Sequence, residues 1–114
     1  MVHAPGLMTA KVPPGAKLFE VHYGFPPDAY TGEEPHTDGA TFQIDWEGDG
    51  MIICVLNTVI DPANNPAHRR LQHFLVKLPA TTDPSARLVL RTLPGKTTTK
   101  DWTCWSHPFF DKVR

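Results

Sequence analysis

Residues 40–46 have the sequence Ala40-Thr41-Phe42-Gln43-Ile44-Asp45-Trp46, in which apolar and polar side chains alternate. Successive side chains of a β-strand point to opposite faces, so Phe42, Ile44 and Trp46 are predicted to share one buried face. The same period of two recurs in four further stretches, residues 17–23, 71–78, 86–93 and 101–107. The alternation therefore predicts a series of short strands, each with one face on a core.

The prolines separate these apolar runs. They lie at Pro13-Pro14, Pro26-Pro27, Pro35, Pro62, Pro66, Pro79, Pro84, Pro94 and Pro108. A long helix would need roughly ten residues without such a break. Six or more short strands between turn-rich loops predict an all-β fold, an antiparallel two-sheet β-sandwich.

Three local features refine this prediction. The run 51–60 is almost continuously apolar, which is typical of a strand that is buried on both faces or leads into a corner. The segment Glu47-Gly48-Asp49-Gly50 before it predicts a tight hairpin. The best candidate for a helical turn is residues 62–70.

Length and charge limit the class of protein. The chain has 114 residues, which predicts one domain over residues 1–114. Its 11 Lys+Arg and 12 Asp+Glu leave no basic cluster, which argues against nucleic-acid binding. No apolar run approaches a membrane span, and residues 1–10 lack the pattern of a signal peptide. These features favour a cytoplasmic location, or an extracytoplasmic one if the sequence is an excised domain.

The two cysteines, Cys54 and Cys104, lie in apolar, strand-like runs without a C-x-x-C spacing. Free cysteines in such runs behave as small apolar residues, so two buried thiols are the favoured interpretation. A disulfide and a catalytic cysteine stay open as alternatives.

Catalytic motifs are weak. The six histidines, at His3, His22, His36, His68, His73 and His107, show no close metal-ligand pair. Neither Ser85 nor Ser106 lies in a G-x-S-x-G turn. We therefore expect no enzyme, and a small hydrolase that uses His36 or His68 with a carboxylate is the least favoured alternative.

The loop 30–39 is the most polar part of the chain. Its carboxylates, Glu33, Glu34 and Asp38, together with loop carbonyls are the ligands that calcium prefers. A structural calcium ion is one interpretation of this loop. The other is a solvated loop whose Asp38-Gly39 turn begins the next strand.

Trp102 and Trp105 cannot both face the core of a regular strand, because their positions differ by three, an odd number. Trp102 shares its face with Cys104 and is the predicted core residue. Trp105 then points outward or is covered by a loop. Beside Asp101, an outward Trp105 could stack on a sugar ring while the carboxylate accepts hydrogen bonds from hydroxyl groups; ordinary packing is the competing interpretation.

At these residues the sequence resembles jelly-roll domains of the galactose-binding-like class, close to carbohydrate-binding modules attached to bacterial glycosyltransferases and cell-envelope proteins. The resemblance covers about residues 16–107 and is carried, in order, by Tyr23-Gly24-Phe25, Thr37-Asp38-Gly39-Ala40-Thr41-Phe42, Asp61-Pro62, Leu71-Gln72, Leu78-Pro79, Asp101-Trp102 and Trp105-Ser106. Two departures are His68-Arg69-Arg70 in place of an acidic residue followed by Arg-Gly, and Cys104 in place of a larger aromatic residue.

The resemblance implies a jelly-roll sandwich that binds a glycan, with a structural calcium ion in some members. It favours a non-catalytic carbohydrate-binding module whose loops at Tyr30, Asp38, Asp101 and Trp105 contact sugar. A glycan or a larger cell-envelope protein is then the expected partner. The alternative from a different class is a structural or protein-interaction sandwich with no small-molecule site, which pairs through exposed faces or edges.

Overall fold

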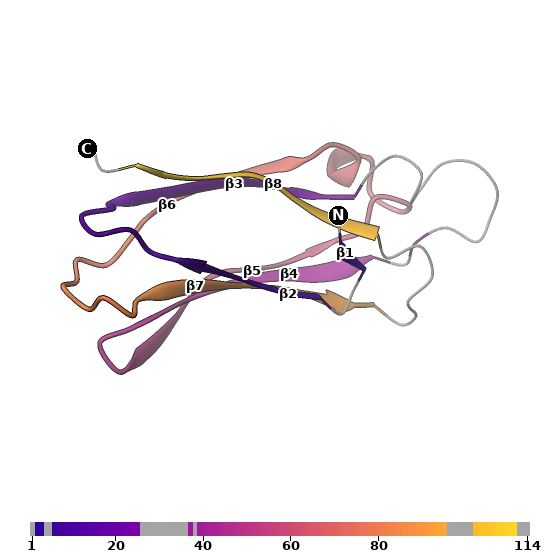
Figure 1. Ribbon diagram of the computed structural model, residues 1–114. Coiled ribbons are helices and arrows are strands. Elements are labelled where there is room, and N and C mark those ends of the chain that lie inside the picture. Colours follow the sequence, from indigo (N-terminus) through magenta and orange to yellow (C-terminus); the bar gives the residue numbers. More distant parts are fainter. Residues whose placement is uncertain (1, 4–5, 26–36, 38, 96–101, 112–114) are drawn as a thin grey trace.

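The computed structural model describes residues 2–3, 6–25, 37, 39–95 and 102–111 (Figure 1). The elements in this part of the chain are β1 (Val2–His3), β2 (Gly6–Lys11), β3 (Leu18–Gly24), β4 (Ala40–Gly48), β5 (Met51–Ile60), the 3-10 helix η2 (Pro66–His68), β6 (Gln72–Lys77), β7 (Arg87–Pro94) and β8 (Trp102–Asp111). No helix of these residues is long and apolar enough to cross a membrane.

The strands form two four-stranded antiparallel sheets. The first sheet has the order β1-β8-β3-β6 and the second sheet has the order β2-β7-β4-β5. Figure 1 shows them as two stacked layers. The all-β, two-sheet β-sandwich predicted from the sequence is therefore confirmed.

The chain changes sheet at every connection in this order of strands except the β4–β5 hairpin. Such an order agrees with the jelly-roll topology that the resemblance implies. Membership of the galactose-binding-like class stays a prediction.

The inner faces of the sheets form the core by the predicted alternation. On β3 the residues Phe19 and Val21 are fully buried, and on β4 the same holds for Phe42, Ile44 and Trp46. The neighbouring strands add Leu88, Leu90, Phe74 and Val76 to the same packing. Each fully buried side chain of this size stabilises the fold by about 1.5–3 kcal/mol relative to exposure, so these strands hold the sheets together.

The β4–β5 turn confirms the predicted hairpin. Asp49 and Gly50 both have positive φ, at 52° and 73°. Two central residues with positive φ define the type I′ turn, whose twist matches that of the flanking strands. Just before β4, the backbone leaves no room for a side chain at Gly39. Its φ is 94°, and an added Cβ would lie 2.8 Å from the carbonyl oxygen of Ile60.

The expectation of a doubly buried strand over 51–60 is wrong. β5 lies at the edge of the second sheet, and Ile52 and Val59 are 70% and 60% exposed. An edge strand receives cover from one neighbour, and only its inner face lies over the core. Apolar composition alone cannot distinguish this position from a central one.

Trp105 differs from the sequence expectation as well. Its ring lies 5.4 Å from that of Phe42 on the opposite sheet and 5.7 Å from that of Tyr23, between centroids. It therefore faces inward, so of the two alternatives for Trp105 the outward-pointing one is wrong, while Cys104 lies on the outer face. Alternation holds from Thr103 to Trp105, but pairing with β3 decides which residues face the core.

The register of β8 shifts opposite the stretch from Glu20 to His22. This irregularity brings both Trp105 and Phe110 to the inner face although their positions differ by five, an odd number. β8 continues to Asp111, beyond the predicted end at residue 107. The short strands β1 and β2 were not predicted.

Both cysteines are free thiols. Cys54 is exposed and Cys104 is half-buried, so the prediction of two buried thiols is wrong. The predicted helical turn contains the single-turn η2, which Asn65 caps by accepting a hydrogen bond from the Ala67 N–H at 3.0 Å. In the same loop His68 Nδ1 accepts a hydrogen bond from the Asp61 N–H at 2.9 Å.

Candidate functional site

Most residues of the predicted sugar and calcium sites lie outside the described part of the chain. These are Tyr30, Glu33, Glu34, Asp38 and Asp101. Both sites stay predictions for that reason. Of the predicted site residues only Trp105 is described, and its ring belongs to the aromatic packing between the sheets.

A different group of side chains gathers on the outer surface of the first sheet, which comprises the outward residues of β6, β3 and β8. The register aligns Leu75, Glu20 and Phe109 in one row across these strands. His73, His22 and Ser106 form the next row. Residues far apart in the sequence are thus adjacent because the sheet pairs their strands.

This surface contains a small hollow of about 190 Å³, lined by Leu18, Glu20, Leu75, Phe109 and Asp111. Phe109 is 58% exposed and Leu75 is 50% exposed. Two carboxylates therefore lie beside an accessible aromatic ring. An exposed apolar ring with polar groups next to it is a common feature of ligand-binding surfaces.

Two histidines lie next to Glu20 on this surface. His73 Nε2 lies 3.5 Å from Glu20 Oε2, with about half of each side chain exposed. The ring of His22 packs on that of His73 at a centroid distance of 4.9 Å. Glu20 therefore has an imidazole ring beside it at the hollow. Sequence analysis missed this group, because its members are single residues on separate strands.

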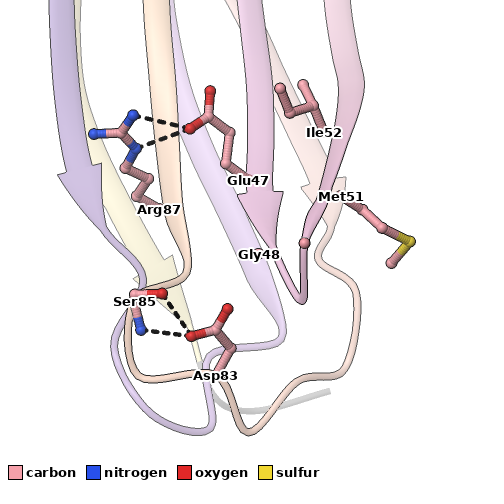
Figure 2. Close-up of a pocket in the computed structure, with 8 residues that line it drawn as sticks. Glu47, Gly48, Met51, Ile52, Asp83, Ser85 and Arg87 are labelled. Atoms are coloured by element: carbon pink, nitrogen blue, oxygen red, sulfur yellow. Dashed lines mark hydrogen bonds and ion pairs between the residues drawn. The ribbon is translucent and has the colours of Figure 1, made fainter.

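A larger hollow of about 460 Å³ lies at the β4–β5 hairpin and is lined by Glu47, Gly48, Gly50, Met51, Ile52, Asp83, Ser85 and Arg87 (Figure 2). Its polar side chains bind one another. Arg87 donates from both Nε and Nη2 to Glu47 Oε1, at 3.0 and 2.9 Å. These contacts stabilise the sheet and leave less hydrogen-bonding capacity for a ligand.

Asp83 connects this hollow to the neighbouring loop. It accepts hydrogen bonds from the Ser85 hydroxyl at 2.6 Å, the Asp49 N–H at 2.8 Å and the Ser85 N–H at 2.8 Å. These donors, the Ser85 hydroxyl first, lower the pKa of Asp83 below its ordinary value. The carboxylate joins the β4–β5 hairpin to the loop before β7 by hydrogen bonds, which is a structural role.

An apolar groove of about 510 Å³ lies between the β2–β3 and β6–β7 loops. Its lining includes Val12, Pro13, Ala16, Pro84 and Ala86. It carries no aromatic ring in its lining, so it lacks the stacking surface that the outer surface of the first sheet offers.

The described residues contain no group of three or more His, Cys, Asp or Glu side chains that could hold a metal ion. His68, one of the two histidines considered for a hydrolase, contacts groups of its own loop: besides the Asp61 N–H, its Nε2 lies 3.4 Å from Asn65 Nδ2. His36, the other one, lies outside the described residues.

Comparison with known proteins adds one relative. The chain is 30% identical over 99 residues to an uncharacterized protein of Archaeoglobus fulgidus. The match covers 85% of this chain but only 24% of that relative, which is therefore much longer than the matched region. No known protein family matches the chain, and no solved structure does.

Proposed function

We propose that the protein is a non-catalytic carbohydrate-binding module that contacts a sugar through the outer surface of its first sheet. The observation that carries this proposal is the exposure of Phe109, at 58%, beside a hollow that contains Glu20 and Asp111. The resemblance of the sequence to carbohydrate-binding modules supports the same function.

The chemistry of the hollow fits a single sugar ring. The C–H groups on one face of a pyranose pack against an aromatic ring, and Phe109 offers its ring to solvent. Carboxylate oxygens accept hydrogen bonds from sugar hydroxyl groups, and Glu20 and Asp111 both line the hollow. A shallow site of this kind suits one or two residues of a longer glycan, so the expected affinity is modest.

A glycan array, screened with and without calcium, tests the proposal, with titration of every glycan that binds. We expect Phe109→Ala to weaken binding about tenfold or more, which corresponds to about 1.4 kcal/mol or more. Glu20→Gln should weaken it less, because an amide still offers one acceptor. Leu7→Ala is the matched control, since Leu7 is an exposed apolar residue at 64% on the second sheet.

Two results would contradict this placement of the site. No binding across a broad array would remove the carbohydrate proposal. Binding that survives Phe109→Ala but needs Asp38 or Asp101 would move the site to residues outside the described part of the chain. Calcium dependence would support the proposed cation site at Glu33, Glu34 and Asp38.

The second candidate function is a protein-interaction sandwich, alone or within a larger cell-envelope protein. The specific observation in its favour is the uncharged, exposed edge strand β5. A match to 24% of a longer relative is in keeping with a module used inside larger chains.

A further inference from the structure

β5 is a long and poorly protected edge of the second sheet. It has ten residues, Met51–Ile60, with no charged residue and no proline. By contrast, β6 at the edge of the first sheet has six residues and contains His73 and Lys77. Natural sheet edges are usually short or carry charges, because an open edge pairs readily with another strand. Within the described residues β5 pairs with β4 alone.

The side chains of β5 are apolar and accessible as well. Met51, Ile52 and Val59 are between 51% and 70% exposed, and Ile53 is 37% exposed. Exposed apolar side chains on an edge with free backbone groups favour the addition of a strand. The edge therefore offers both hydrogen bonds and apolar contact to a partner strand.

A register shift makes the strand symmetric about its own centre. Pairing with β4 places Ile52, Cys54, Asn57 and Val59 on the outer face. At the shift, Val55 and Leu56 both pack toward the core. The sequence of outward and inward residues is consequently the same from either end of β5.

This symmetry fixes how a second copy could pair over the full strand. An antiparallel copy aligned about the point between Val55 and Leu56 sets outward residues against outward residues throughout. An alignment centred on Cys54 would set Ile52 against Leu56, which faces the other way. The irregularity thus permits one full-length register for self-pairing.

The charged side chains of β4, the strand next to β5, do not oppose this contact. On the adjoining strand β4, Asp45 Oδ2 lies 2.6 Å from Arg91 Nη1, and Glu47 forms the ion pair with Arg87. Each carboxylate is therefore balanced within its own chain. The carboxylates of β4 therefore add no unbalanced charge to the contact between two copies.

We propose that β5 binds a second copy of this chain, antiparallel and about a two-fold axis, so that the two second sheets become one continuous sheet. In this pairing Ile52 lies opposite Val59 of the partner subunit, and Cys54 lies opposite Asn57 of the partner subunit. The same surface patch serves both copies, as a two-fold interface requires. The interface is independent of the sugar proposal, because it uses the other sheet.

The first experiment measures mass in solution by light scattering over a dilution series. The expected mass is twice the 12.7 kDa of the chain. The double variant Ile52→Lys with Val59→Lys sets lysine opposite lysine at both ends of the seam and should give a monomer. The matched control, Ile52→Lys with Val59→Glu, sets lysine opposite glutamate and should restore the dimer. A monomeric wild type, or two charge variants with the same mass, would overturn the proposal.

The second experiment tests the register by oxidation. In a Cys104→Ala background, Asn57→Cys should form a disulfide-linked dimer, because Cys54 lies directly opposite the new thiol. Val59→Cys is the control on the same strand and face, since its nearest partner thiol is at the longer diagonal position. Cross-linking that is no faster for Asn57→Cys than for Val59→Cys would overturn the register. Circular dichroism confirms that each variant is folded.

Discussion

The outer surfaces of the two sheets differ in how their charged and apolar side chains are arranged. On the second sheet the charged residues of the central strands are bound to one another, as in the pair of Asp45 with Arg91. Its edge strand β5 carries four exposed large apolar residues, Met51, Ile52, Ile53 and Val59. On the first sheet an exposed Phe109 lies near the end of β8 beside the carboxylates of Glu20 and Asp111, and the edge strand β6 is short.

This comparison distinguishes residues that stabilise the fold from exposed residues that contribute little to its stability. The inner faces of both sheets are filled by the same alternation, so the fold places few demands on the outer positions. The internal ion pairs of the second sheet contribute to stability. The exposed apolar residues, Phe109 on one sheet and Ile52 with Val59 on the other, contribute little to stability and are the ones that the two proposals assign to contacts with other molecules.

The largest expected change in stability comes from replacing a buried phenylalanine, Phe42, and it is compared with the replacement of an exposed one, Phe109. Phe42→Ala removes a fully buried ring that contacts Trp105 and Tyr23, and should destabilise the protein by about 3–5 kcal/mol. Phe109→Ala should change stability by about 0.5 kcal/mol or less. Urea denaturation measures both. Equal losses would show that Phe109 is a packing residue and would weaken its assignment to a binding surface.

An intermediate effect is expected within the second sheet. The side chain of Asp45 is 9% exposed and accepts from Arg91 and Gln43, whereas that of Glu47 is 21% exposed and its partner Arg87 is 52% exposed. Asp45→Ala should therefore cost about 1–3 kcal/mol and Glu47→Ala about 1 kcal/mol or less.

Removing both Asp45 and Arg91 tests whether the two side chains stabilise the protein as a pair, or whether each single variant is destabilised because it leaves one charge without its partner. Asp45→Ala with Arg91→Ala should be less destabilising than the sum of the single variants, because neither partner is left alone. Denaturation at low and high salt completes the test. Additive losses would show that the two side chains do not interact in solution.

The sequence predicts the core well because alternation is local. Phe19, Val21, Phe42, Ile44 and Trp46 all lie where period two places them. It does not predict which strands are edges, since that depends on pairing between distant segments. The apolar run of β5 was therefore expected to be buried, and the face of Trp105 was assigned wrongly for the same reason.

The candidate site was harder to find than the core. Glu20, His73 and Phe109 come from three strands, and none of them belongs to a motif. Only the register shows that they share one surface. An exposed aromatic residue in an alternating strand is visible in the sequence as a phenylalanine next to another, at 109 and 110, and one of the two must face outward. That signal could have drawn attention to the surface, but not to its carboxylates.

The smallest expected change in stability concerns Asp83, whose carboxylate accepts a hydrogen bond from the β4–β5 hairpin of the second sheet. Because hydrogen bonds lower its pKa in the folded protein, the folded state holds this proton less tightly than the unfolded state. The stabilisation is present above the ordinary pKa of 3.8 and is lost as the pH falls through the lowered value. Asp83→Asn should thus lower Tm slightly near neutral pH, and the difference from wild type should disappear in strong acid.

Thermal denaturation between about pH 7 and about pH 2 measures this difference. Ser85→Ala, which removes the hydroxyl donor, should retain part of the pH dependence, because the N–H groups of Asp49 and Ser85 still donate to the carboxylate. The effect is small since the carboxylate is in contact with water and its interactions are screened. A loss of Tm in Asp83→Asn that is equal at every pH would show that packing of the loop, and not the charge of Asp83, holds the hairpin.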